Sequence, residues 1–410
     1  MGKGETIIWN VKHEILNSFE KRDNSIVLFG AWFGKRFADN SRYLYQYLSE
    51  NKSELGLSHI VWVTRSKKIC KEIVSMGYEA YMMDSEESLF YHKKAGIHII
   101  CNSGLYVDGT NADILTQYSN GAIKINLWHG LGGIKGVDFA SEEYLKLKKL
   151  HPINCFFKES LRKLKIYRVF CIAHGGWGDA FRLSTTSFET KIFEQYFCLP
   201  RKKFIESGYP RNQSNIKLMQ SEIDVIEQIK KSKLSVLYMP TFRKDNTYYT
   251  DPLSDGELIS FLHENDLLWI EKKHAADNSD LLGDIENSVI LRLNSEFDAN
   301  TILPYVDLVI TDYSSVSWDA LYHKKPILFY MPDFEYYLEN DRGFFLKPEE
   351  FIIGLASYNI NQLKQVLFDY CVDFTRMLPE NEDEIFNKFW GQKIDCEQIW
   401  KDIIGFVRIK

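Results

Sequence analysis

A histidine follows a short apolar segment in the first third of the sequence. His129 and Gly130 come directly after Ile123–Trp128, and an apolar segment followed by glycines is typical of a buried strand that ends in a turn. The unperturbed pKa of histidine, about 6.5, suits this side chain to take a proton from an alcohol at neutral pH. The pattern indicates a candidate general base, and a histidine that only hydrogen-bonds a turn would give the same pattern.

Cationic and hydroxyl side chains follow further apolar segments. Such cations bind phosphate oxygens by charge-assisted hydrogen bonds, and serines at a helix start add donors beside its free backbone N–H groups. We therefore expect a phosphate or diphosphate site, and we expect Asp312, an anion, to hold its loop instead. Solvated charge clusters, structural ion pairs and ordinary helix capping are the alternatives. The candidate ligands are Arg211, Arg243, Lys273, His274, Ser314, Ser315 and Arg342.

Several nucleotide and metal motifs are missing from the sequence. It contains no Walker A sequence, no Gly-x-Gly-x-x-Gly opening a helix, no His-Glu-x-x-His and no Asp-x-Asp. We therefore expect a reaction that stabilises phosphate charge with side-chain cations and backbone N–H groups, without a cofactor or an essential metal.

The candidate residues are positioned by short apolar segments that alternate with helical stretches. Nearly continuous apolar strands predict parallel sheets covered on both faces, whose ligands bind beyond the carboxyl ends of the strands. About ten strands favour an α/β protein with two Rossmann-like domains and mainly parallel sheets. We expect domains at residues 1–200 and 201–360, and helices at 361–410 that pack against the first domain. The predicted strands are Ser25–Phe29, His59–Val63, Ile97–Cys101, Ile123–Trp128, Val169–Ala173, Phe204–Glu206, Ser235–Met239, Leu267–Glu271, Val306–Thr311 and Pro326–Tyr330.

Composition excludes several classes of protein. The 410 residues carry a net charge of −6, whereas a general nucleic-acid binder has a basic excess. The seven cysteines are odd in number and form no Cys-x-x-Cys pair, which argues against a disulfide framework or a zinc ribbon. No window reaches the roughly 18 apolar residues that a membrane helix needs. We therefore expect a cytoplasmic protein whose contact with the membrane is peripheral.

Residues 141–170 are the candidate for that contact. They carry eight lysines and arginines against three glutamates, interleaved with leucines and phenylalanines. A basic stretch with apolar faces can lie on the anionic inner face of the cell membrane or bind an anionic polymer. A surface helix pair with its usual charges is the equal alternative.

Taken in order, these motifs resemble the CDP-glycerol glycerophosphotransferase family, which includes teichoic-acid primases and polymerases and their capsule relatives. The resemblance covers most of residues 125–345 and implies a GT-B fold of two facing domains, with the donor bound by the C-terminal one and the acceptor by the N-terminal one. The matching segments are Asn126–Lys135, Gly208–Asn212, Tyr238–Arg243, Lys272–His274, Thr311–Tyr330 and Arg342–Phe345.

The resemblance also implies roles for individual residues. His129 matches the family's catalytic base and His274 its second essential histidine, beside the donor phosphates. Arg243, Ser314 and Ser315 match donor-phosphate positions, and Arg211 and Arg342 match less closely. Leu131-Gly132-Gly133 departs from the family pattern, in which a threonine usually follows Trp-His-Gly. We expect that loop to face the acceptor.

The reaction implied is transfer of glycerol phosphate from CDP-glycerol to a lipid-linked or polymeric glycan acceptor, with release of CMP. Three alternatives stay open. CDP-ribitol fits the same phosphate site, a UDP-sugar glycosyltransferase or epimerase shares the architecture, and a non-catalytic scaffold would not need the histidines.

Overall fold

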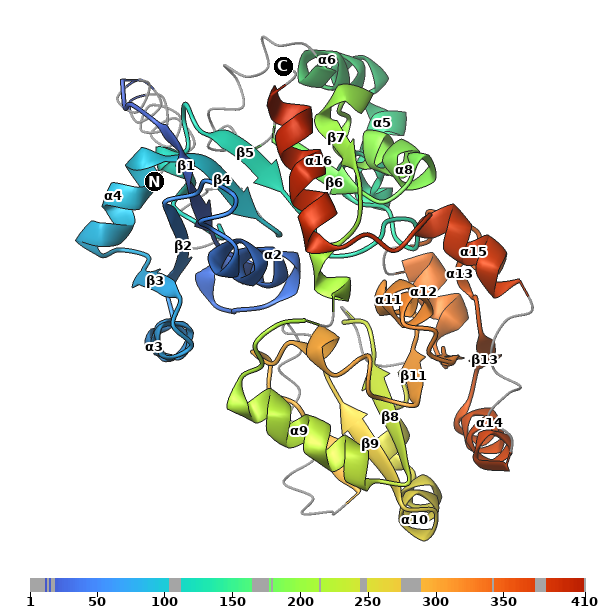
Figure 1. Ribbon diagram of the computed structural model, residues 1–410. Helices are drawn as coiled ribbons and strands as arrows, with labels where there is room; N and C mark the ends of the chain where they lie inside the picture. Colours follow the sequence, from blue (N-terminus) through green and yellow to red (C-terminus); the bar gives the residue numbers. More distant parts are fainter. Residues whose placement is uncertain are drawn as a thin grey trace. The chain divides into compact units, whose positions relative to one another are not determined.

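A computed structural model of the chain forms two compact units (Figure 1). It describes residues 12, 15, 19–102, 112–163, 177, 180–213, 215–243, 249–273, 289–340, 343–372 and 381–408. Unit 1 consists of residues 1–129, 147–217 and 392–410, and unit 2 consists of residues 130–146 and 218–391. The first domain therefore extends beyond the expected boundary at residue 200, to residue 217. Of the expected third segment, 361–410, it includes residues 392–410.

Unit 1 is built on a seven-stranded sheet in the order β3-β2-β1-β4-β5-β6-β7. All neighbouring pairs are parallel, so the carboxyl ends of the strands lie at one edge. Strands β2, β4 and β5 are buried on both faces at nearly every position, as their apolar sequences predict. They are β1 (Asp23–Phe29), β2 (His59–Thr64), β3 (Glu79–Met82), β4 (Ala95–Ile100), β5 (Ile123–Asn126), β6 (Phe181–Ser184) and β7 (Phe204–Glu206).

Helices connect these strands, and several begin at a capping side chain. Ser66, Ser85 and Thr186 each accept a hydrogen bond from a backbone N–H three residues later, which satisfies a donor that the helix itself leaves unpaired. The helices and 3-10 turns of unit 1 are η1 (Trp32–Gly34), α2 (Asp39–Glu50), α3 (Lys67–Ser75), α4 (Glu86–Lys94), η2 (Thr116–Tyr118), α6 (Pro152–Lys163), α8 (Ser187–Phe197), η6 (Arg201–Lys203), η7 (Pro210–Asn212) and α16 (Cys396–Arg408).

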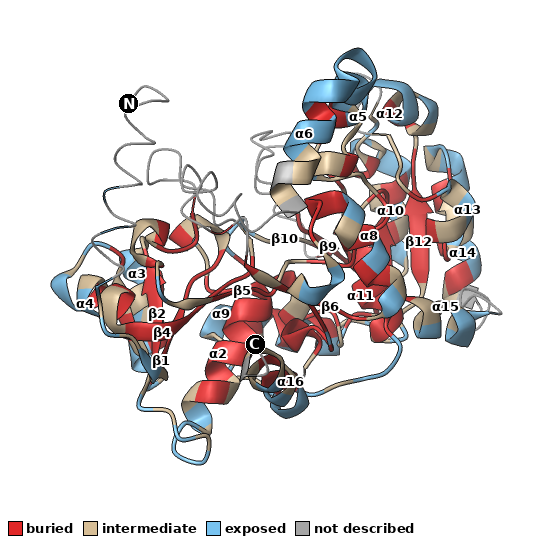
Figure 2. Ribbon diagram, turned by 90° about the horizontal axis from the view of Figure 1, so that it is seen from above, coloured by how far each residue is buried: buried red, intermediate tan, exposed pale blue. Residues whose placement is uncertain are grey.

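Unit 2 has a six-stranded parallel sheet in the order β10-β9-β8-β11-β12-β13. Its core joins the central strands to α10 and α14 through Leu258, Leu363 and Leu367. Figure 2 shows central strands of each sheet as buried, while the helices that cover them are partly exposed. The strands are β8 (Leu234–Met239), β9 (Leu267–Glu271), β10 (Ile290–Arg292), β11 (Leu308–Thr311), β12 (Ile327–Tyr330) and β13 (Leu355–Ser357).

The remaining helices belong to unit 2, except that α5 (Glu142–Leu150) runs across the division at residues 146 and 147. They are η3 (Asp138–Ala140), α9 (Gln220–Lys231), η8 (Pro252–Ser254), α10 (Gly256–Glu264), η9 (Ala299–Thr301), α11 (Val316–Tyr322), α12 (Phe334–Asn340), α13 (Pro348–Phe351), α14 (Ile360–Val372) and α15 (Glu382–Phe389).

The C-terminal helices divide between the two units. Leu363 and Leu367 of α14 lie in the core of unit 2, and Phe389 of α15 stacks on Trp318 of α11. Of the described helices after residue 359, α16 belongs to unit 1, where it contacts α2 and β7 (Figure 1). The expected segment 361–410 is therefore not one body.

Two parallel-sheet units with covering helices confirm the predicted α/β class. In the described part of the chain, no helix is both long enough and apolar enough to cross a membrane.

Candidate active site

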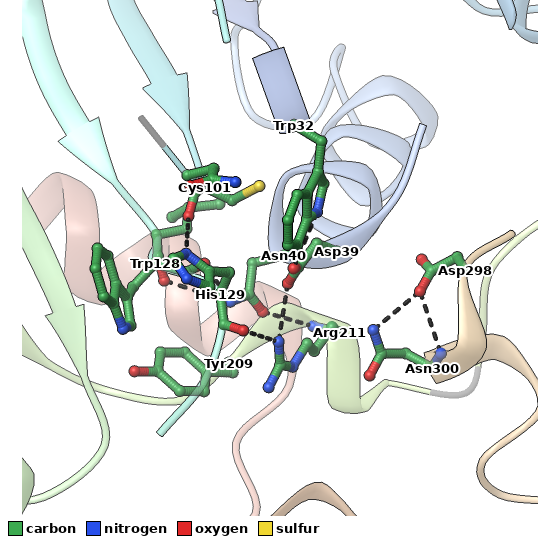
Figure 3. Close-up of polar contacts among 12 residues, drawn as sticks. Trp32, Asp39, Asn40, Cys101, Trp128, His129, Tyr209, Arg211, Asp298 and Asn300 are labelled. Atoms are coloured by element: carbon green, nitrogen blue, oxygen red, sulfur yellow. Dashed lines mark hydrogen bonds and ion pairs between the residues drawn. The ribbon is translucent and has the colours of Figure 1, made fainter. Parts of the chain in front are cut away.

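The candidate base, His129, lies beyond the carboxyl end of β5. It is the last residue of the first segment of unit 1, and Trp128 before it has a φ of 60°, in the left-handed region that non-glycine residues seldom adopt. The segments that follow the neighbouring strands β4 and β1 bring Cys101 and Trp32 close to it. Three adjacent strands therefore end at this histidine (Figure 3).

The imidazole of His129 is held in one tautomer. Nδ1 lies 3.1 Å from the backbone carbonyl oxygen of Cys101, and because a carbonyl only accepts, Nδ1 must carry the hydrogen. The lone pair of the neutral ring is then on Nε2. The ring centroid lies 5.6 Å from that of Trp32 and 4.3 Å from that of Trp128.

The surroundings of His129 lower its pKa below the usual value. Burial is the main cause and Arg211 acts in the same direction, while Asp39 and the Cys101 carbonyl oppose them. The ring is therefore neutral at neutral pH and able to accept a proton, as a general base must.

The residues that hold this loop come from the start of α2 and from η7. Asn40 donates from Nδ2 to the carbonyl oxygen of Trp128 at 2.8 Å, and Arg211 donates from Nη1 to that of His129 at 2.5 Å. Arg211 also forms a buried ion pair with Asp39, whose Oδ1 lies 3.1 Å from Nη1 (Figure 3). Sequence reasoning missed Asp39 and Asn40, and the polar pair directly before a helical stretch was their only signal.

Arg211, predicted to be a ligand of the donor phosphates, lies beside the loop of His129. It belongs to unit 1, and its side chain is buried against a carboxylate and a carbonyl of that unit. In the structure Arg211 contacts the loop of His129, and its role as a ligand of the donor phosphates stays a prediction.

Arg243, predicted to be a phosphate ligand, is enclosed by carboxylates in the structure. Its side chain is only 2% exposed and is paired with Asp312 and Asp333. Nε and Nη2 donate to the two Asp333 oxygens at 2.9 and 3.0 Å, and Nη1 donates to the carbonyl oxygen of Thr241 at 2.5 Å. Burial lowers the pKa of Arg243, but the two carboxylates outweigh it and raise the pKa above the ordinary value.

Asp312 connects the loops that follow β8 and β11. Its carboxylate oxygens accept from the backbone N–H of Thr241 at 2.9 and 3.0 Å, besides pairing with Arg243. Because the side chain is buried, these contacts fix the segment that carries Ser314 and Ser315.

The remaining candidates have varied surroundings. Ser314 and Ser315 are partly exposed at the start of α11, and Ser314 Oγ accepts from the backbone N–H of Val316 at 3.4 Å. Lys273 lies 3.3 Å from Asp251 and 3.8 Å from Glu271, so its charge is already balanced by carboxylates. Gly130 is buried and begins the second unit. His274 and Arg342 lie outside the described residues.

The loop Leu131–Gly133, which is predicted to face the acceptor, belongs to unit 2. The backbone N–H of Leu346 donates to the Gly133 carbonyl oxygen at 2.8 Å, and that of Phe345 donates to Ile134 at 2.9 Å. The loop is thereby tied to Phe345, the last residue of the Arg342–Phe345 motif, and to Leu346 after it.

Within the described ranges, no group of three or more His, Cys, Asp or Glu side chains is arranged to hold a metal ion. The chemistry available in unit 1 is proton abstraction by a neutral imidazole. Unit 2, taken by itself, offers the hydroxyl groups at the start of α11.

Comparisons with known proteins identify the family of this chain. The model of the family CDP-Glycerol:Poly(glycerophosphate) glycerophosphotransferase matches residues 13–388. The chain is 25% identical to a teichoic acid poly(glycerol phosphate) polymerase of Bacillus spizizenii, over 79% of this chain and 78% of that protein. It is 23% identical to a teichoic acid ribitol-phosphate primase of the same species, over 87% and 85%.

A solved structure shares the fold. The wall teichoic acid polymerase TagF superposes with a TM-score of 0.68 at 19% identity, and the match covers 98% of this chain and 94% of that one. This likeness confirms the GT-B fold class. Since the family model spans nearly the whole sequence, the chain belongs to the CDP-glycerol:poly(glycerophosphate) glycerophosphotransferases and is an enzyme of that transferase class.

Proposed function

We propose that this enzyme transfers glycerol phosphate from CDP-glycerol to a hydroxyl of a lipid-linked or cell-surface glycan or polyol-phosphate acceptor. The main observation in support of this proposal is the neutral His129 ring, whose Nδ1 is hydrogen-bonded to the Cys101 carbonyl oxygen at 3.1 Å. Nε2 takes the proton of the acceptor hydroxyl as its oxygen attacks the β-phosphorus. The bond from that phosphorus to the bridging oxygen breaks, and CMP leaves with the bonding electrons.

The donor phosphates are proposed to bind unit 2. The partly exposed hydroxyls of Ser314 and Ser315 support this assignment, because donors aimed at a phosphate stabilise the charge that develops during transfer. The family resemblance adds His274 and Arg342. We propose that no essential metal takes part, since these donors act on the phosphate directly.

CDP-ribitol is the second candidate donor, because the ribitol-phosphate primase is nearly as similar to this chain as the glycerol-phosphate polymerase. We expect the enzyme to release CMP from CDP-glycerol. CDP-ribitol and a UDP-sugar are tested as alternative donors in separate parallel reactions. EDTA is expected to leave the rate unchanged. Faster turnover of CDP-ribitol would reassign the alcohol, and release of UDP would overturn the proposed reaction class.

The surface of α5 and α6 supports a peripheral contact with an anionic membrane. Leu150, Ile153, Phe156 and Phe157 are 60–74% exposed, and Lys148, Lys149 and Lys158 of the same segment are exposed as well. Figure 2 shows that much of α5 and α6 is exposed. Apolar side chains can enter the acyl boundary while lysines meet lipid phosphates. The part of the expected segment at 164–170 lies outside the described residues.

Replacing both Phe156 and Phe157 with serine should weaken binding to phosphatidylglycerol-containing vesicles about tenfold or more, because two apolar anchors are lost. Vesicle sedimentation measures this. Phe90→Ser is the matched control, since Phe90 is 54% exposed on α4 of the same unit. Equal binding by the double variant and the control would exclude this surface.

A further inference from the structure

The backbone on both sides of the candidate base is held by one buried polar cluster. Trp128 and Asp39 both have positive φ, 60° and 63°, which costs a non-glycine residue free energy and persists only where surrounding contacts enforce it. Asn40 donates from Nδ2 to the carbonyl oxygens of Leu127 and Trp128 at 3.3 and 2.8 Å. Arg211 holds the next carbonyl, that of His129.

The residues of this cluster also bind one another. The Arg211 backbone N–H donates to Asn40 Oδ1 at 3.1 Å, and its side chain pairs with Asp39. Asp39 in turn accepts from the Trp32 indole N–H at 3.2 Å, and that ring lies beside His129. The side chains of Arg211 and Asp39 are only 4% and 5% exposed, so this ion pair is shielded from the solvent that screens surface pairs.

The two charges of the pair act on the imidazole in opposite directions. In the described part of the chain, the charged side chains whose electrostatic effect reaches the ring are Asp39 from α2 and Arg211 from η7. A nearby anion favours the imidazolium form, and a nearby cation disfavours it. An ion pair beside the base can therefore set its basicity without contacting the substrate.

We propose that Asp39 and Arg211 are a positioning pair that fixes the loop of His129 and tunes the proton affinity of its ring. This deepens the proposed function and rests on it for the role of His129 as base. Asp39 and Arg211 act through His129, so their loss should lower kcat and leave the KM for CDP-glycerol unchanged.

The test follows the His129 ring directly, by NMR of protein labelled at histidine Cε1, with the resonance assigned from its absence in His129→Ala. We expect Asp39→Asn to lower the pKa of His129 and Arg211→Gln to raise it. Because the base must be neutral, the acid limb of the kcat profile should move to lower pH in the first variant and to higher pH in the second. Both should lose about ten- to a hundredfold in kcat through misplacement.

Two further variants separate charge from general damage. Arg211→Lys keeps the cation and loses the planar fork, so it should lower kcat while the His129 titration stays near that of the wild type. Asp402→Asn is the matched control, since Asp402 accepts from Ser207 Oγ at 2.6 Å elsewhere in unit 1, and it should change neither the titration nor the profile.

The outcomes are distinct. An unchanged His129 titration in both Asp39→Asn and Arg211→Gln overturns the positioning pair. If the pKa of His129 shifts in opposite directions in the two variants but the acid limb of the kcat profile does not shift with it, the positioning pair is supported. The assignment of His129 as the base in the proposed function is then overturned. Opposite shifts that the acid limb follows support both.

Discussion

The variant His129→Ala should lose about 10²- to 10⁴-fold in kcat, the usual contribution of a positioned general base. The physical reason is that Nε2 carries the lone pair while Nδ1 is tied to Cys101, so no other nitrogen of the ring can take the proton. Affinity for CDP-glycerol should stay within about twofold of the wild type, because the donor is proposed to bind unit 2. CMP release and calorimetric titration of CDP-glycerol measure the two quantities.

A matched histidine in the same unit tests whether the loss is specific. His59 is partly exposed and pairs with Glu79 at 3.0 Å, so His59→Ala should keep its turnover. Turnover of His129→Ala equal to that of His59→Ala would show that His129 is not the base.

The second large effect is on stability and concerns Arg243. Replacing Arg243 with methionine leaves Asp312 and Asp333, each 1% exposed, without the cation that neutralises them. Breaking a buried pair by removing one partner typically costs about 3–5 kcal/mol, because an uncompensated charge remains buried. We expect urea unfolding, followed by tryptophan fluorescence, to show a loss of this size in the free energy of unfolding.

The same variant decides between the two roles considered for Arg243. A ligand of the donor phosphates would raise the KM for CDP-glycerol and leave unfolding unchanged. Lys388→Met is the control, since Lys388 forms a half-exposed pair with Glu350 at 3.3 Å in the same unit and should cost less than about 1 kcal/mol. Unfolding of Arg243→Met that matches this control would restore the interpretation as a ligand.

Much of the fold follows from strand sequences that are apolar at nearly every position. The predicted segments at 204–206 and 267–271 coincide with β7 and β9, and seven others overlap strands with shifts of at most two residues at an end. The segment at 169–173 lies outside the described residues. The prediction missed β3, β6, β10 and β13.

The missed strands share a physical cause. Three of them lie at sheet edges, where short strands need less apolar sequence. The fourth, β6, is interior but carries Arg182, which is buried with its guanidinium carbon 4.3 Å from the centroid of the Phe197 ring. A cation that packs on an aromatic face looks like a surface residue in the sequence.

The site was only partly predictable, because its contacts are long-range. The position of His129 follows from the general rule for the ends of parallel strands. Arg211 and Arg243 follow strands in the same way, yet they meet Asp39 and Asp333, 172 and 90 residues away. An arginine that faces a ligand and one that neutralises a buried carboxylate have the same local sequence, so only the fold separates them.

The place of α16 in unit 1 has a consequence for the order in which the chain matures during synthesis. Its Ile399 and Ile403 are fully buried, and Asp402 binds Ser207 just after β7. Every strand of unit 2 is translated, through Ser357 of β13, before this helix begins at Cys396. The unit whose synthesis starts first is therefore completed last, and the surface of β7 and α2 that α16 covers stays open until translation of the last helix.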